Sequence, residues 1–214
     1  MKDVRRYEKG AASPIPEEKI KIFKEKIKEY GENEVYRERN YMLFLIGLGT
    51  GFRLQDLVTL LIGDLKDSIR CGYLEIQEEK QYNQWKSNLS RYPNKSRPPK
   101  RRVELGNSLI KALKSYVKDK KRSEYAFPSR KGQHITQEYF SKVLRSIGDE
   151  LNINNISGHS LRKTYVTIIY EKSGNDIVKA KNAIGHKSVE ETRRYIGEVE
   201  RDVKKATKII DSII

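Results

Sequence analysis

The sequence predicts a mostly helical α+β domain with one small antiparallel β-sheet. Apolar residues recur at helical spacing through most of the 214 residues. Alternating, β-branched segments are confined to two short stretches, residues 73–76 and 102–105. The chain is long enough for one large domain or two small ones, and no internal repeat divides it. We therefore expect one helical domain in which two strands pair.

The first third of the chain predicts three helices. Residues 1–14 are polar and are interpreted as a leader or linker. Pro16 suits the first turn of a helix that ends before Gly31. Its apolar positions are Ile20, Phe23, Ile27 and Tyr30. Residues 35–48 are apolar on most faces, which indicates a central buried helix. A shorter helix follows the turn at residues 49–51, and it is marked by Leu54, Leu57, Val58 and Leu61.

The pattern changes at residue 73. The two strand-like segments are separated by a long excursion, residues 81–99, which contains three prolines. Helical spacing resumes at residues 109–117 and at residues 140–151, the latter with Thr136 as a candidate N-cap. Residues 160–172 and 176–184 predict two more helices. Ser188 and Glu191 have the spacing of a capping box, which predicts a final helix after residue 188.

Composition limits the partners of the chain. Its 44 Lys and Arg against 29 Asp and Glu give a formal net charge of +15. This charge favours a polyanion such as nucleic acid, although solubilising surface charge is the alternative. The longest apolar stretch, residues 41–48, is too short to cross a membrane, and no signal peptide is visible. One cysteine and three histidines offer neither an internal disulfide nor a zinc site. We expect a cytoplasmic protein with no metal or cofactor.

Rare and basic residues gather at predicted helix boundaries. Arg53 follows a glycine-rich turn at a helix start, and His159 lies three residues before Arg162 at another. His186 precedes the last predicted helix, and Tyr195 follows it by nine residues. Helix N-termini attract anions through their free N–H groups, so basic residues at these places suit a phosphate site. Each feature alone is weak, and their combination in order is the stronger signal.

Four segments in this order resemble the catalytic domain of the tyrosine recombinase (phage integrase) family. They are residues 49–57, 158–164, 184–188 and 192–196, and the resemblance extends from about residue 13 to residue 197. It implies the integrase catalytic fold over residues 15–200. Family members usually carry an N-terminal DNA-binding domain as well. Only about 14 residues precede the first predicted helix, so we expect that domain to be absent from this chain.

The resemblance implies roles for two arginines and two histidines. Arg53 and Arg162 would hold the scissile phosphate, and guanidiniums have the geometry and charge to stabilise a developing phosphorane without metal. His159 would contact the phosphate or help to remove the proton of the nucleophile. His186 would bind a non-bridging oxygen.

The same resemblance supplies a nucleophile and an acid. Tyr195 would attack the phosphate and form a 3′-phosphotyrosine. Lys80, at the end of the first strand, would protonate the leaving 5′-oxygen, with Lys100 beside the return strand as the rival candidate. Asp56, three residues after Arg53, is interpreted as a support for that arginine, and a plain surface charge is the alternative.

A basic insert lengthens the predicted hairpin. Residues 80–102 contain eight Lys and Arg, no Asp or Glu, and interleaved aromatic residues. Such a segment can follow a DNA backbone and stack on bases. A solvated loop without that role is the alternative. Besides Lys80, the candidate DNA-binding residues are Lys86, Arg91, Lys95, Arg97, Lys100, Arg101 and Arg102.

The predicted function is site-specific recombination of double-stranded DNA by a homotetramer. Residues 201–214 are expected to form a tail helix, which either docks on a neighbouring protomer or packs on its own chain. Two other functions remain open at this point. One is a type IB topoisomerase-like relaxase, which would share the chemistry. The other is a catalytically silent DNA-binding protein of the same fold.

Overall fold

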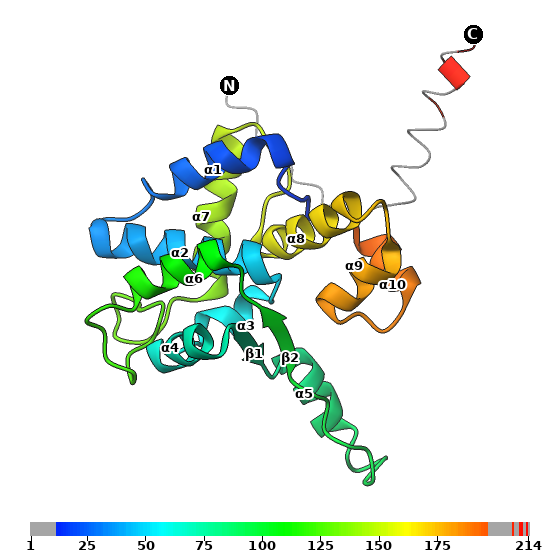
Figure 1. Cartoon of the computed structure of the whole chain (residues 1–214), viewed down its shortest axis with the longest axis horizontal. Coiled ribbons are helices and arrows are strands. Elements are labelled where there is room, and N and C mark those ends of the chain that lie inside the picture. The colour runs from blue at the N-terminus through cyan, green and yellow to red at the C-terminus, as the bar shows by residue number, and fades with distance from the viewer. Residues whose placement is uncertain (1–11, 197–206, 208–209, 212, 214) are drawn as a thin grey trace, which may run out of the picture.

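The computed structural model describes residues 12–196, 207, 210, 211 and 213 (Figure 1). Within this part of the chain, the fold is mostly helical with one two-stranded antiparallel sheet, as the sequence predicts, and the sheet lies at the base of the segment that projects from the body. The elements in chain order are η1 (Glu17–Lys19), α1 (Ile20–Ile27), α2 (Glu34–Thr50), α3 (Leu54–Val58), α4 (Ile62–Cys71), β1 (Tyr73–Ile76), α5 (Glu79–Ser87), β2 (Arg101–Glu104), α6 (Asn107–Tyr116), α7 (Gln137–Glu150), α8 (Gly158–Lys172), α9 (Ile177–Ile184) and α10 (Val189–Ile196).

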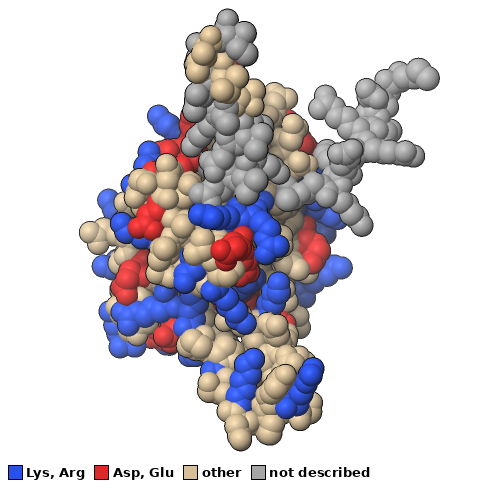
Figure 2. Space-filling view, turned by 90° about the vertical axis from the view of Figure 1, so that its right-hand side faces the viewer, with Lys and Arg blue, Asp and Glu red and all other residues tan. Residues whose placement is uncertain are grey.

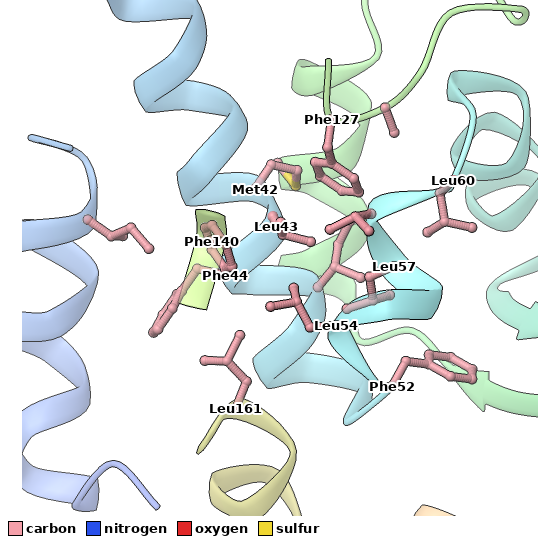
Figure 3. Packing of buried hydrophobic residues seen from close by; sticks show 14 of the residues in the cluster. Met42, Leu43, Phe44, Phe52, Leu54, Leu57, Leu60, Phe127, Phe140 and Leu161 are labelled. Carbon is pink, nitrogen blue, oxygen red and sulfur yellow. The ribbon is translucent and has the colours of Figure 1, made fainter. Parts of the chain in front are cut away.

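Helix α2 lies at the centre of the main core. Asn33 begins it, because its side chain accepts a hydrogen bond from the Tyr36 N–H at 3.0 Å. Side chains of α2 and α3 pack with Phe127, Phe140 and Leu161 from later parts of the chain (Figure 3). A Cβ at Gly47 would lie only 2.7 Å from Leu161, so this glycine lets α8 approach α2 closely. The core thereby fixes the two helix starts that carry Arg53 and Arg162.

A second, smaller apolar cluster holds the C-terminal helices. It consists of Val166, Tyr170, Ala180, Ile184 and Ile196, which come from α8, α9 and α10. These helices lie together at one side of the molecule (Figure 1). Helix α8 belongs to both clusters, because Leu161 near its start packs into the main core. The helices α9 and α10 are therefore attached to the main core chiefly through α8.

The sheet and the segments around it differ from the prediction in three ways. Strand β2 begins one residue earlier than predicted, and the antiparallel register joins Tyr73 to Glu104 and Ile76 to Arg101. Helix α4 was not predicted; Asp64 caps it by accepting the Leu61 N–H at 2.8 Å. The predicted excursion at residues 81–99 includes most of helix α5. Lys80 therefore lies in the first turn of a helix and not at the end of a strand, which corrects the prediction.

The basic insert folds into a protrusion that projects from the body (Figure 1). Helix α5 forms one arm, and the returning chain is tied to it by a hydrogen bond of 2.7 Å from Trp85 Nε1 to the Lys95 carbonyl. The rings of Tyr82 and Trp85 are in contact, with centroids 5.6 Å apart, and Arg97 lies over Tyr82 at 4.8 Å. Aromatic and cation–π contacts thus join the two arms of this polar segment, although none of its side chains is fully buried.

Two predicted segments lie mostly outside the described residues. They are the leader, of which residues 1–11 are not described, and the tail helix over residues 201–214, of which only residues 207, 210, 211 and 213 are described. Among the described helices, none is both long and apolar enough to cross a bilayer.

Candidate active site

Arg53 lies where a left-handed turn ends α2 and begins α3. Gly51 has φ +60° and caps α2, and a Cβ there would collide with the ring of Tyr165. Arg53 is the N-cap residue of α3, and its side chain is about one-fifth exposed. The glycine-rich turn is therefore required both by its backbone conformation and by close packing, and it presents Arg53 at the rim of the site.

A buried carboxylate lies beneath the arginines. The side chain of Glu78 is only 1% exposed, and its Oε1 lies 2.8 Å from Arg53 Nη1 and 3.2 Å from Arg162 Nη1. The Nε of a third guanidinium, Arg101, is 3.6 Å from the same oxygen. Sequence reasoning missed Glu78, because a glutamate in the polar run before Lys80 carries no signal of burial. Its charge offsets the repulsion among three cations held close together.

Arg162 connects three of the sequence segments that predicted the site. Its Nη1 donates to the Gly51 carbonyl and its Nη2 to the Ile184 carbonyl, both at 2.6 Å. Ser157 caps α8 and so sets the orientation of the first turn, from which Arg162 projects. The guanidinium is 3% exposed, and its two carbonyl partners fix its plane.

Arg101, predicted to lie among the DNA-binding residues of the insert, belongs instead to this buried cluster and not to the exposed surface of the insert. Its side chain is 10% exposed, and its guanidinium lies 4.0 Å from the centroid of the Phe52 ring. Nη1 donates to the Ala183 carbonyl and Nη2 to the Thr50 carbonyl, each at 2.7 Å. Burial lowers the pKa of Arg101 to about 10, which leaves it charged at neutral pH. Its contacts place the guanidinium beside Arg162 in the buried cluster and not on the exposed surface of the protrusion.

The rings of Tyr195 and His186 are in contact near Arg53 and Arg162. Their rings meet edge to face, with centroids 5.2 Å apart. The Tyr195 hydroxyl is buried without a hydrogen-bond partner among the described residues. Burial raises the pKa of Tyr195, and the positive charges of Arg162 and Arg53 act in the opposite direction. The phenol is therefore protonated at neutral pH and close to two cations.

His186 is held as a neutral ring. Its Nδ1 lies 3.1 Å from the Thr192 hydroxyl, and burial lowers its pKa to about 4. The carboxylate of Glu191, 3.9 Å from Nε2, would form an ion pair only with the protonated ring. At neutral pH the histidine can therefore donate one hydrogen bond and accept another.

His159 and Lys80 are exposed to solvent at the edge of the arginine cluster. With Arg53 they line an open cavity of about 820 Å³ between the starts of α3, α5 and α8 and the side of α7. Burial, followed by the charges of Arg53 and Arg162, lowers the pKa of His159. Lys142 and Arg145 of α7 also line this cavity. Sequence reasoning missed both, although their spacing of three residues places them on the polar face of a predicted helix.

Asp56 is buried and supports the start of α5. Asp56 is only 7% exposed, so it is not the solvated surface charge that was the alternative interpretation. Oδ1 accepts a hydrogen bond from the Glu79 N–H at 2.9 Å, which satisfies the first free donor of α5. Burial raises the pKa of Asp56. The carboxylate thereby connects the turn of Arg53 to the segment that carries Glu78 and Lys80.

The other basic residues of the insert are at the surface. Lys86, Arg91, Lys95, Arg97, Lys100 and Arg102 are all exposed. Lys100 lies 3.7 Å from Glu75, and Arg102 pairs with Glu104 at 2.7 Å. On the face in Figure 2, Lys and Arg cover more of the surface than Asp and Glu, and patches of Lys and Arg are also visible on the mostly uncharged protrusion at its lower end. Among the described residues, no group of three His, Cys, Asp or Glu could hold a metal ion.

A family model described as the phage integrase family matches residues 19–201. The chain belongs to the phage integrase family. The matched range includes every candidate residue from Arg53 to Tyr195. The mostly helical arrangement with a two-stranded sheet is the fold of tyrosine recombinase catalytic domains.

Curated relatives are identical to this chain at about a quarter of the aligned positions. The probable integrase/recombinase YoeC of Bacillus subtilis is 26% identical over 190 residues, which are 88% of this chain and 93% of that protein. Tyrosine recombinase XerD of Listeria monocytogenes is 26% identical over 168 residues, 73% of this chain and 49% of the relative. The chain thus spans nearly all of the Bacillus protein and about half of the Xer relatives that it matches.

Solved structures share the fold at lower identity. XerH bound to its palindromic difH substrate in a post-cleavage complex has a TM-score of 0.65 and 23% identity, and the alignment covers 94% of this chain and 54% of XerH. The Tn1549 transposon integrase in complex with circular intermediate DNA has a TM-score of 0.62 and 15% identity, with coverage of 90% and 66%.

Proposed function

We propose that this chain is the catalytic domain of a site-specific DNA recombinase that cleaves and rejoins DNA through a 3′-phosphotyrosine. The main support is one structural observation. Arg53 and Arg162 share the Glu78 carboxylate, and both place positive charge at the Tyr195 phenol. A nucleophile beside two guanidiniums suits attack on a phosphodiester, whose charge increases in the transition state. Family membership supports the same reaction.

The chain's own side chains supply the charge for this reaction. Arg53 and Arg162 stabilise the pentacoordinate phosphorane, and neutral His186 donates to a non-bridging oxygen in the tautomer that carries its proton on Nε2, with Nδ1 accepting from the Thr192 hydroxyl. His159, with its lowered pKa, is neutral at pH 7 and accepts the phenol proton. No metal is required in this scheme, because the cations are held by protein contacts before DNA arrives.

The bond changes balance without ATP. The Tyr195 oxygen bonds to phosphorus as the bond from phosphorus to the 5′-oxygen breaks. Lys80 donates a proton to that leaving oxygen, so the products are a phosphotyrosine and a 5′-hydroxyl. The phosphotyrosine retains the ester, and attack by a 5′-hydroxyl reverses the step. If that hydroxyl comes from another duplex, strands are exchanged.

The assembly and the cellular site belong to the same proposal. DNA at a specific site is the substrate, a homotetramer exchanges the strands of two duplexes, and the C-terminal tail joins neighbouring protomers in the cytoplasm. The net charge and the exposed basic insert support the DNA substrate. A relaxase would act on one duplex only, and a silent DNA-binding protein would have no chemical need for Tyr195.

Covalent capture from a randomised pool of DNA tests the proposal and finds the target site in one step. The protein is incubated with nicked suicide duplexes of randomised sequence, and adducts that survive SDS are recovered and sequenced. We expect enrichment of one sequence, with capture unchanged in EDTA. Two captured duplexes should then exchange strands, whereas a relaxase would only remove supercoils. Absence of adducts across the pool would favour the silent DNA-binding protein, and loss of adducts in EDTA would refute the metal-free scheme.

A further inference from the structure

Arg101 is the one basic residue of the predicted hairpin insert whose side chain turns into the protein. Its neighbour Arg102 is exposed, whereas Arg101 makes two carbonyl hydrogen bonds and lies against the ring of Phe52. The contacts of Arg101 reach three different parts of the site. Two of its N–H groups donate to backbone carbonyls, and its Nε lies 3.6 Å from the Glu78 carboxylate without a hydrogen bond.

These parts are the three segments that hold the reacting groups. Thr50 ends α2 directly before the turn of Arg53, and Ala183 lies near the end of α9, three residues before His186. The third contact, from Nε to Glu78, reaches the segment just before Lys80. One guanidinium therefore connects the phosphate-binding turn, the lysine segment and the helix end that precedes His186 and Tyr195.

The geometry of α9 provides an independent observation. Gly185, which ends α9, has φ +67°, and a Cβ there would lie 3.3 Å from Arg101 Cδ. The glycine thus leaves room for the arginine stem to pass along the helix end. The cationic head also lies at the negative end of the α9 dipole, where Arg162 binds the adjacent Ile184 carbonyl. Two arginines from different elements consequently hold the end of a single helix.

We infer that Arg101 is a positioning residue for strand cleavage, which holds Arg53, Lys80 and the His186–Tyr195 unit in one arrangement through its contacts to Thr50, Glu78 and Ala183. The inference rests on the proposed function and adds a residue to it. An arginine is required here, because its planar fork reaches two carbonyls and a carboxylate at once. A lysine ammonium keeps the charge but cannot span the three partners.

The decisive variant keeps the positive charge of Arg101 and changes the shape of its side chain. Single-turnover adduct formation is measured at saturating concentrations of the captured nicked duplex. We expect Arg101→Lys to lower the rate about 10²-fold, the size of effect expected when reacting groups are displaced by about 1 Å. The dissociation constant of the DNA should stay that of the wild type. Arg70→Lys, at an exposed arginine on α4, is the matched control and should cleave at the wild-type rate.

A wild-type cleavage rate in Arg101→Lys would overturn the inference. If Arg101→Lys does not give the unfolding transition of the wild type, Gly185→Ala provides the second variant. It brings a Cβ within 3.3 Å of the stem of Arg101 and strains the left-handed end of α9, and it leaves the charge of Arg101 in place. We expect slower cleavage with unchanged DNA affinity, and an unchanged rate would again contradict the inference.

A second measurement does not depend on recombination. The salt dependence of binding to a random-sequence duplex is compared for Arg101→Gln and Arg102→Gln. Loss of a phosphate contact should lower the salt slope by about one. We expect the wild-type slope for Arg101→Gln, and a slope reduced by that amount would overturn its assignment to the interior. Failure of the wild type to form any adduct would refute the proposed function, while this comparison still tests the role of Arg101.

Discussion

The ring of His186 meets the ring of Tyr195 edge to face, with an angle of 89° between their planes. This contact holds the phenol in one orientation while its hydroxyl makes no hydrogen bond in the described part of the molecule. A buried hydroxyl without a partner is costly, so its retention points to a role in a complex with a further group. The scissile phosphate, bound by Arg53 and Arg162, would bring that group to the hydroxyl.

Tyr195→Phe is expected to abolish covalent attachment and to leave DNA affinity nearly unchanged. The substitution removes the nucleophilic oxygen and keeps the ring that contacts His186. SDS-resistant adducts and a binding titration measure the two effects. Tyr125→Phe, at a partly exposed tyrosine in another part of the chain, is the control and should form adducts normally. Adducts formed by Tyr195→Phe would assign the nucleophile to another tyrosine.

Lys80→Ala is expected to slow cleavage by about 10²–10⁴-fold, the range for a positioned proton donor. The reason is that Lys80 lines the same cavity as Arg53 and His159, whereas Lys100 is not among the residues that line it and pairs with Glu75. A 5′-phosphorothiolate substrate, whose sulfur leaves without a proton, should restore most of the rate. Lys100→Ala should mainly weaken DNA binding. If the sulfur substrate rescued Lys100→Ala and not Lys80→Ala, Lys100 would be the proton donor and Lys80 the DNA-binding residue.

The cleavage rate is expected to fall in acid, with a midpoint below pH 6.5. Burial and the neighbouring cations lower the pKa of His159, so the ring remains neutral and able to accept a proton until the pH falls through that lowered value. Single-turnover rates at a series of pH values measure the midpoint. His159→Gln should lower the rate about 10²-fold or more and remove the acid limb. Loss of the limb in His186→Gln instead would make His186 the base.

Asp56→Ala is expected to slow cleavage and to destabilise the protein by about 0.5–2 kcal/mol, the usual cost of losing a helix cap. Asp56→Asn retains an acceptor for the Glu79 N–H and should preserve much of the cleavage rate and of the stability. Asp64→Ala removes the equivalent contact from α4, away from the site, and is the matched control. It should lose stability without slower cleavage. Equal cleavage losses in the two alanine variants would contradict a specific role for Asp56.

The main helices could be predicted because burial leaves a periodic pattern. Ile20, Phe23 and Ile27 share one face of α1, and α2 is apolar on most sides because it is central. Helix α5 has no such pattern, since it projects from the body and has no buried residue. It depends on tertiary contacts, the hydrogen bond from its first N–H to Asp56 and that from Trp85 to Lys95. Local sequence could not reveal either.

The site shows the same division between local and tertiary signals. The sequence indicated that Arg53, Arg162 and Tyr195 belong together, because each lies in a short segment that resembles a family motif. Glu78 and Arg101 could not be predicted to join them, since burial of a charged residue depends on the partners that surround it. Arg101 also lies in a basic run, where a residue exposed to DNA and a residue buried against carbonyls have the same sequence pattern.

The division of the apolar interior into two clusters gives the two halves of the site different local stabilities. Arg53 is anchored by the extensive main core, while Tyr195 is carried by a helix that packs on only a few apolar side chains. Local opening requires less free energy where fewer buried contacts must be broken. We therefore expect local opening of α9 and α10 to cost less free energy than opening of the turn that carries Arg53. Amide protons of α9 and α10 should accordingly exchange faster than those of the buried residues of α2 and α3.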